Sequence, residues 1–83
     1  MRISTKGKYG LRAMVDLAVH SSDAPISLST IAERQELSLG YMEQVFSVLR
    51  KAGLVNSIKG AQGGYVLADN PANITVGDVL RVL

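Results

Sequence analysis

The chemically suggestive part of this sequence is a run of short polar residues between Ser38 and Lys51. Its apolar residues recur at i, i+3, i+4 and i+7, which predicts one helix with a buried face made of Met42, Val45, Phe46 and Leu49. The opposite face carries small or hydrogen-bonding residues, namely Gly40, Glu43, Gln44, Ser47 and Lys51. Such a face can lie against base edges in a DNA major groove while the other side packs in a core. An ordinary surface helix with a solvated face is the alternative interpretation.

The ends of this helix are also marked in the sequence. Ser38 is a good N-cap, and Gly53 follows Ala52 where a left-handed residue would end the helix. Arg50 and Lys51 place two cations at its C-terminal end.

Composition narrows the class of protein. The chain has 83 residues, 47% of them hydrophobic, which is enough for one folded domain spanning residues 1–83. It has no cysteine, so a disulfide framework, a thiolate metal site and a thiol nucleophile are excluded for this chain. The apolar runs are too short to cross a membrane, and residues 1–6 lack the apolar core of a secretion signal. We therefore expect a cytoplasmic protein without membrane contact.

The distribution of charge says more than the net charge of +2. Residues 1–12 contain four cations and no acid, and residues 44–68 contain three cations and no acid. These cations are Arg2, Lys6, Lys8, Arg12, Arg50, Lys51 and Lys59. Two basic segments brought together by the fold suit a polyanion, although a membrane surface or an acidic protein would also fit them.

The first helix is expected from Ser4 or Thr5 to His20 or Ser21. Its predicted inward face is Leu11, Met14, Val15 and Ala18, and its outward face is Lys8, Arg12 and Asp16, with Arg12 and Asp16 paired at i, i+4. A basic first turn opposes the helix dipole and makes sense if a phosphate also binds there; a plain solvated start is equally acceptable. Tyr9 is either a core aromatic or a hydroxyl donor to phosphate.

A helix-turn-helix is expected next. Residues 26–28 are predicted as a short edge strand, and Ser27 can cap a second helix that ends near Gln35 or Glu36. Only a short turn separates this helix from the third, so the two must cross steeply. Glu36 occupies a position where such turns often have Gly or Asn, and a left-handed backbone there would cost a residue with a Cβ about 1 kcal/mol.

The last third of the chain predicts a hairpin and a final helix. Residues 54–58 and 65–67 are strand-like and flank a glycine-rich tip at residues 59–64. Residues 75–78 match a capping box, and a helix follows to Leu83. That helix ends with its apolar stripe incomplete, so the chain is expected to be a piece of something longer. The order of elements predicts a mainly α winged helix-turn-helix with a small β-hairpin.

The sequence resembles the IscR and CymR type of bacterial winged-helix regulators, which form the Rrf-two family. The resemblance spans the whole chain and rests on Met1–Gly10 (MRISTKGKYG), Ile31–Gln35 (IAERQ), Tyr41–Phe46 (YMEQVF), Gly53–Val55 (GLV) and Lys59–Tyr65 (KGAQGGY). It implies a homodimeric transcriptional regulator that binds double-stranded DNA in a sequence-specific way. Such regulators are commonly repressors and act in iron–sulphur, cysteine or redox metabolism. Where members hold an iron–sulphur cluster, the resemblance puts its cysteines and a long dimerisation helix beyond these residues.

The resemblance also implies site residues. Bases are expected to be read by Gly40, Glu43 and Gln44, of which Gly40 departs from the serine common in iron–sulphur members. Contacts to the DNA backbone are expected from Arg2, Thr5, Lys6, Tyr9, Ser38, Tyr41, Ser47, Arg50 and Lys51. The wing is expected to use Lys59, Gly60, Gln62 and Gly63 at the minor groove, where Lys59 replaces the more usual arginine and acts as a point charge.

The other classes of function are a protein-interaction module, an enzyme and an RNA-binding protein. A winged helix can instead be a protein-interaction module, here with the third helix and Val79, Leu80 and Leu83 as the docking surface. An enzyme is disfavoured because His20 is the only histidine and no carboxylate pair, nucleophile–base pair or metal-ligand spacing is present. RNA binding is disfavoured because a single Phe offers no stacking platform.

Overall fold

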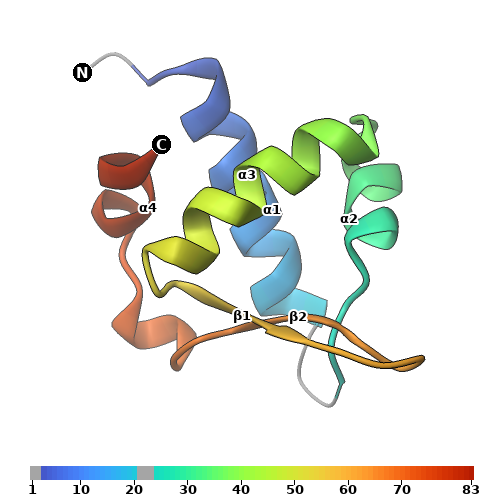
Figure 1. Ribbon diagram of the computed structural model, residues 1–83. Coiled ribbons are helices and arrows are strands. Elements are labelled where there is room, and N and C mark those ends of the chain that lie inside the picture. Colours follow the sequence, from blue (N-terminus) through green and yellow to red (C-terminus); the bar gives the residue numbers. More distant parts are fainter. Residues whose placement is uncertain (1–2, 21–23) are drawn as a thin grey trace.

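The computed structural model describes residues 3–20 and 24–83, so the predicted contact at Arg2 and the end of the first helix at Ser21 lie outside the described residues. In Figure 1, α3 crosses in front of α1, with α2 and α4 on either side and a β-hairpin along one edge. The elements are α1 (Thr5–His20), α2 (Leu28–Gln35), α3 (Leu39–Lys51), β1 (Val55–Ile58), β2 (Gly64–Leu67), the 3₁₀ helix η1 (Pro71–Asn73) and α4 (Val76–Val82). This order confirms the predicted winged helix-turn-helix.

The core lies where α3 packs on the other helices and the hairpin. Each large apolar side chain buried there contributes about 1.5–3 kcal/mol to folding. Its members are Ala13, Met14, Leu17, Ile31, Ala32, Met42, Val45, Phe46, Leu49, Val55 and Val79. The four residues predicted as the inward face of α3 are all fully buried.

Caps define both helices of the helix-turn-helix. The hydroxyl of Ser38 accepts from the backbone N–H of Tyr41 at 3.1 Å, and that of Ser27 accepts from Thr30 N at 3.2 Å. Glu36 has φ 57° and ψ 43°, a left-handed conformation that costs about 1 kcal/mol for a residue with a Cβ. It ends α2 and turns the chain directly into α3, as predicted. Gly53, at φ 78°, ends α3 in the same way.

The predicted inward face of α1 is wrong in part. Val15 is 61% exposed, whereas Asp16 is only 6% exposed. The buried side instead follows Gly7, Gly10, Ala13, Met14, Asp16 and Leu17. The buried side of α1 differs from the predicted one because α4 packs against the two glycines: a Cβ at Gly7 would lie 3.1 Å from Leu80 Cδ2, and one at Gly10 would collide with Leu83. A prediction based on the spacing of apolar side chains does not take account of glycines that make room for another helix.

Asp16 joins α1 to α2 instead of pairing with Arg12 along its own helix. Arg34 donates two hydrogen bonds to it, from Nη2 at 2.7 Å and from Nε at 3.0 Å, and Gln35 Nε2 donates a third at 3.1 Å. His20 Nδ1 lies 2.9 Å from the backbone carbonyl oxygen of Asp16, a contact of the kind expected for a histidine that caps carbonyls at a helix end. Burial raises the pKa of Asp16, but the hydrogen bonds from Arg34 and Gln35 and the charge of Arg34 lower it below its usual range.

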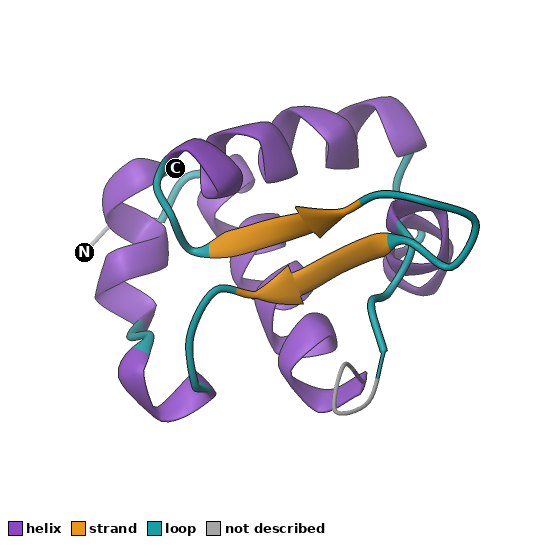
Figure 2. Cartoon of the chain, turned by 60° about the horizontal axis from the view of Figure 1, so that its bottom comes forward, coloured by secondary structure: helices purple, strands orange, loops and turns teal. Residues whose placement is uncertain are grey.

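The hairpin has the antiparallel register Val55↔Leu67 to Ile58↔Gly64. Figure 2 shows the two strands together and their connecting loop beside the segment that leads into α2. The predicted strand at residues 26–28 is wrong: Ile26 makes one isolated bridge, and Leu28 already begins α2. Ile26 N donates to Tyr65 O at 3.0 Å, and Tyr65 N donates to Ile26 O at 2.8 Å. This bridge ties the wing to the start of the helix-turn-helix.

The final helix begins with the predicted capping box. Asp78 N donates to Thr75 Oγ1 at 3.0 Å, and Thr75 N donates back to Asp78 Oδ2 at 2.9 Å, which holds the pKa of Asp78 below its usual range. Val79 is only 2% exposed, and Leu80 and Leu83 are half-buried against α1. The α4 part of the surface predicted for a protein-interaction module is therefore largely internal. Among the described residues, no helix is long and apolar enough to cross a membrane.

Substituting Gly64 tests the bridge between wing and helix-turn-helix. Gly64 has φ 152°, and a Cβ there would collide with the backbone of Ile26. We expect Gly64→Ala to lower the free energy of unfolding by more than about 1 kcal/mol in urea titrations followed by circular dichroism. The control is Gly77→Ala on α4, where a Cβ meets nothing closer than 3.6 Å. An equal effect of the two substitutions would contradict the bridge's role.

Substituting Asp16 tests the link between α1 and α2. Asp16→Asn should cost about 2 kcal/mol of unfolding free energy at neutral pH, because the hydrogen bonds from Arg34 lose their charged acceptor. The pKa of Asp16 is lower in the folded chain, so its stabilisation is present above the unfolded pKa of about 4 and is lost as pH falls through the folded pKa. The gap between wild type and variant should therefore shrink in acid.

The matched control is Glu33→Gln, which removes an exposed carboxylate from α2. It should change the unfolding free energy by less than about 0.5 kcal/mol. A gap between wild type and Asp16→Asn that stays constant from neutral to acidic pH would show that Asp16 is not held as a carboxylate.

Candidate nucleic-acid interface

The outer face of α3 is open to solvent at the three predicted base-reading positions. Glu43 and Gln44 are exposed, and neither side chain makes a hydrogen bond to any described residue. At Gly40 a Cβ would have no neighbour within 4 Å, so the first turn of α3 presents bare backbone to its surroundings. Because the opposite face is held in the core, these positions point outward together. Their predicted exposure is confirmed.

Gln44 and Glu43 differ in what they can bind. A glutamine amide carries one acceptor and two donors, so Gln44 can form paired hydrogen bonds to an adenine edge. The Glu43 carboxylate can only accept, which suits a cytosine amino group and repels a phosphate. The face therefore has directional hydrogen-bonding capacity at adjacent positions.

Several cations around α3 have no acidic partner. Arg50 and Lys51 are exposed at the C-terminal end of α3, and Lys59 is exposed on the hairpin. Among the described residues, close contacts between acidic and basic side chains join only Asp16 with His20 and Arg34, and Asp78 with Arg81. The remaining positive charges are thus uncompensated within the described chain, an arrangement that attracts anions.

The start of α1 approaches the start of α3 through two tyrosines. The rings of Tyr9 and Tyr41 are 6.1 Å apart and nearly perpendicular, at 88°. Both tyrosines are half-buried, so Tyr9 is neither a fully buried core aromatic nor a free surface residue. Before them, Thr5 is exposed, Lys6 is half-buried, and Ser4 Oγ caps the helix by accepting from Gly7 N at 2.9 Å.

The two serines predicted to contact the DNA backbone differ in accessibility. Ser38 is exposed, and although its oxygen accepts the capping hydrogen bond, its hydroxyl proton remains available to an external acceptor. Ser47 is half-buried, so it is less accessible than its place on the predicted outer face implies.

The wing tip combines exposure with tight backbone geometry. Lys59, Gly60 and Gln62 are exposed, and Gly60 has φ 115°, which favours glycine. Gly63 is half-buried; its N–H donates to Gly60 O at 3.0 Å, and a Cβ there would collide with Ile58 O. The tip is therefore a short loop of mostly small residues that carries one exposed cation.

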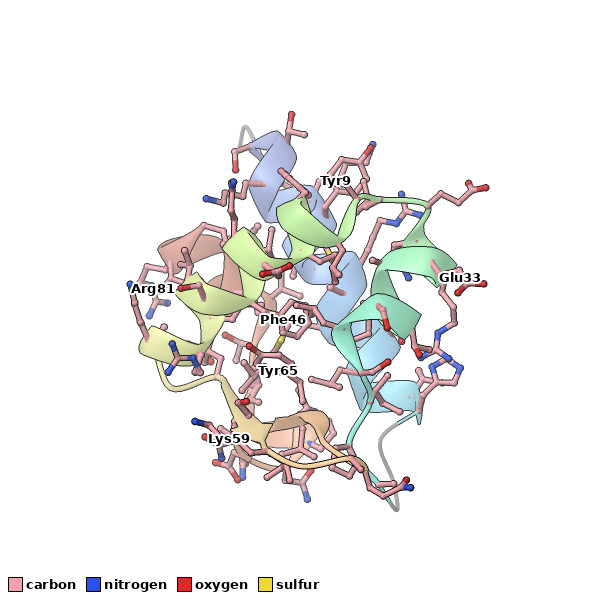
Figure 3. All side chains as sticks on the ribbon, turned by 45° about the vertical axis from the view of Figure 1, so that its right-hand side comes forward. Tyr9, Glu33, Phe46, Lys59, Tyr65 and Arg81 are labelled. Carbon is pink, nitrogen blue, oxygen red and sulfur yellow. The ribbon has the colours of Figure 1, made fainter. Side chains whose placement is uncertain are left out.

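Packing fixes the wing relative to α3. The rings of Phe46 and Tyr65 are 4.8 Å apart, and Leu54 N donates to Leu49 O at 3.0 Å. Figure 3 shows this aromatic pair at the centre, with Tyr9 and Lys59 toward opposite ends of the molecule. Lys59 of the wing and Tyr9 of α1 thus lie on either side of α3.

Sequence reasoning missed the surroundings of Arg12. Its Nε donates to Gln35 Oε1 at 3.0 Å, and its guanidinium carbon lies 5.4 Å from the Tyr9 ring centroid. The i, i+3 spacing of Tyr9 and Arg12 was a signal for the second contact. No sequence signal connects Arg12 to Gln35, which is 23 positions away. In the described part of the chain, no cluster of His, Cys, Asp and Glu could hold a metal ion.

Comparison with known proteins identifies relatives along the whole chain. It is 55% identical over 83 residues to the HTH-type transcriptional regulator CymR of Bacillus subtilis and 52% identical to the regulator IscR of Photobacterium profundum. It covers 60% and 48% of those two proteins, so it spans about half the length of the curated relatives.

Solved structures of related regulators also superpose on this chain along its whole length. The structure of CymR (YrzC), described as the global cysteine regulator of B. subtilis, superposes with a TM-score of 0.96 at 54% identity. That of T. potens IscR superposes with a TM-score of 0.93 at 60% identity. All of this chain and 64% and 61% of those chains are covered. The fold is therefore that of the CymR and IscR winged helix-turn-helix.

Residues 3–83 match the Rrf2 family, which is described as iron-dependent transcriptional regulator. The match agrees with the expectation that the chain is not an enzyme, since the family is one of transcriptional regulators. With its sequence, fold and exposed α3 face in accord, the chain belongs to the Rrf2 family of HTH-type transcriptional regulators.

Proposed function

We propose that this chain is the DNA-binding part of a sequence-specific transcriptional repressor. In this proposal α3 lies in the major groove and the wing at residues 59–64 lies at the minor groove. The observation that carries it is the outer face of α3, where Gly40, Glu43 and Gln44 are exposed and Glu43 and Gln44 have no described hydrogen-bond partner. Side chains already bonded within the protein would have to break those bonds before they could read a base.

Base reading is assigned to Gln44 and Glu43. Gln44 would donate to and accept from one adenine, and Glu43 would accept from a cytosine amino group and exclude sites that bring a phosphate near. Gly40 contributes by having no side chain, so that the first turn of α3 can approach the bases closely. Its missing hydroxyl removes a contact that a serine would offer.

Backbone contacts are assigned to the unpaired cations and hydroxyls around α3. Lys6, Arg50 and Lys51 would bind phosphates and fix the register without reading sequence. Tyr9 and Tyr41 would donate hydroxyl protons beside them, and Lys59 would place a positive charge at the minor groove. The described chain supports this assignment because none of these cations is paired with an acid.

The regulated genes are proposed to belong to iron–sulphur, cysteine or redox metabolism, in the cytoplasm. The B. subtilis relative is described as a global cysteine regulator, and the family as iron-dependent. This chain has no cysteine, so any iron–sulphur cluster of the full-length protein would be held by residues outside it.

The full-length protein is proposed to act as a homodimer, each subunit supplying one reading helix to a half-site. An apolar surface of α1 and α4 supports a covered interface: Val15, Val19 and Val76 are 61%, 66% and 60% exposed. We propose that, in the dimer, this surface is covered by the segment that the longer relatives have beyond the matched region.

The reading of bases is tested by comparing Gln44→Ala with Lys51→Ala on a duplex selected from a randomised pool. Gln44→Ala should cost about 1–3 kcal/mol on the selected duplex and little on a scrambled one, since base contacts carry the specificity. Lys51→Ala should weaken both duplexes about equally, since phosphates are common to them. Equal losses on both duplexes for Gln44→Ala would refute its assigned role.

The dimer is tested on the full-length protein with Val15→Glu. A charge on the apolar surface of α1 should shift the protein from dimer to monomer in sedimentation velocity experiments, because burying an unpaired carboxylate is costly. The control Glu33→Gln, on the exposed side of α2, should leave the dimer unchanged. A Val15→Glu protein that remains fully dimeric at the same concentration would rule out this surface.

A further inference from the structure

We propose that Arg12 is a further phosphate ligand of the DNA interface and that buried Asp16 orients it through Gln35. The inference rests on the proposed function and deepens it, because it adds a residue to the interface. Arg12 is exposed on α1, one turn after Tyr9, and it has no acidic partner among the described residues.

The chain of hydrogen bonds begins at a fixed anion. Asp16, whose side chain is 3% exposed, is held by two hydrogen bonds from Arg34. It also accepts from Gln35 Nε2 at 3.1 Å, so the NH₂ group of that amide points to Asp16. With the NH₂ group held there, the amide oxygen of Gln35 is left to accept from Arg12 Nε, at 3.0 Å. Each bond in the chain determines the direction of the next.

The guanidinium is supported from a second side by an aromatic ring. Its central carbon lies 5.4 Å from the centroid of the Tyr9 ring, and Tyr9 meets the ring of Tyr41 on the first turn of α3. Tyr9 and Tyr41 are already assigned to the DNA backbone. Arg12 thus extends the same edge of the interface by one helical turn.

This arrangement leaves the phosphate-binding end of Arg12 free. A guanidinium has five N–H donors, and the described hydrogen bond uses only the one on Nε. The four N–H donors on Nη1 and Nη2 have no described partner, and they form the fork that matches phosphate oxygens. Because the side chain is already held in place, binding a phosphate would cost less conformational entropy than it costs a free arginine.

A purely structural role for Arg12 predicts a different salt dependence from that of a phosphate ligand. A ligand releases a counterion on binding, so its loss reduces the slope of log affinity against log salt by about 0.9 for each copy bound. A residue that only supports α1 and α2 would alter affinity or stability without altering that slope. Salt titration therefore separates the two roles.

The experiment measures binding of the 83-residue chain to one fluorescently labelled, mixed-sequence duplex across a range of potassium chloride concentrations. Arg12→Ala should weaken binding about tenfold at low salt and reduce the slope by about 0.9 per chain. The matched control is Arg81→Ala, which removes an equal charge from α4; Arg81 is paired with Asp78 at 3.7 Å. Figure 3 shows Arg81 well apart from Tyr9.

A second variant tests the orienting role of Gln35. Gln35→Met keeps a long helix-forming side chain but removes both hydrogen bonds, so binding should weaken while the slope stays that of wild type. Circular dichroism and thermal unfolding establish that each variant is folded; if Arg12→Ala is unfolded, Arg12→Gln is titrated in its place with the same expectation.

Each outcome has one meaning. A slope for Arg12→Ala equal to that of wild type, or a reduction no larger than for Arg81→Ala, overturns the phosphate contact. Wild-type affinity in Gln35→Met overturns the orienting role alone. A wild-type chain that shows no salt-dependent binding to the duplex overturns the proposed function itself, which is a different result from an unchanged slope in one variant.

Discussion

The burial of one face of α3 is the constraint on which the rest of the interface depends. Met42, Val45, Phe46 and Leu49 are fully buried, so α3 cannot rotate about its axis without exposing them. That fixed rotation directs Gly40, Glu43 and Gln44 outward as a group. The hydrophobic core therefore positions the polar face, and a helix with the same outer residues but a weaker inner face would present no defined pattern of donors and acceptors.

Two secondary links hold the neighbouring elements to this frame. Asp16 connects α1 to α2 by three hydrogen bonds, and the Ile26–Tyr65 bridge connects the wing to the segment before α2. Both links join residues that are far apart in sequence. Their consequence is that the cations of α1 and the hairpin, although they come from separate segments, hold defined positions on either side of α3.

Much of this could be predicted from sequence because it depends on local rules. Apolar spacing and the Ser38 cap predicted α3, the Thr75–Asp78 pattern predicted the start of α4, and the short segment after Gln35 predicted a tight turn between α2 and α3. The rotation of α1 could not be predicted, because Gly7 and Gly10 act by leaving room for α4. The partners that Asp16 and Arg12 have on α2 lie 18 to 23 positions away, and no local spacing encodes such a pairing. The roles assigned to Gly40, Glu43 and Gln44 remain predictions, since exposure alone does not establish contact with a base.

The central claim is that the outer face of α3 and the wing tip meet DNA together. The most direct measurement is a titration of the ¹⁵N-labelled chain with duplex DNA, followed by nuclear magnetic resonance of its backbone and side-chain amides. The account predicts that the largest changes occur at the side-chain amide of Gln44, at the backbone of Gly40 and at residues 59–63. Changes confined to α4 and to the exposed valines Val15 and Val19, with the Gln44 amide unaffected, would contradict it.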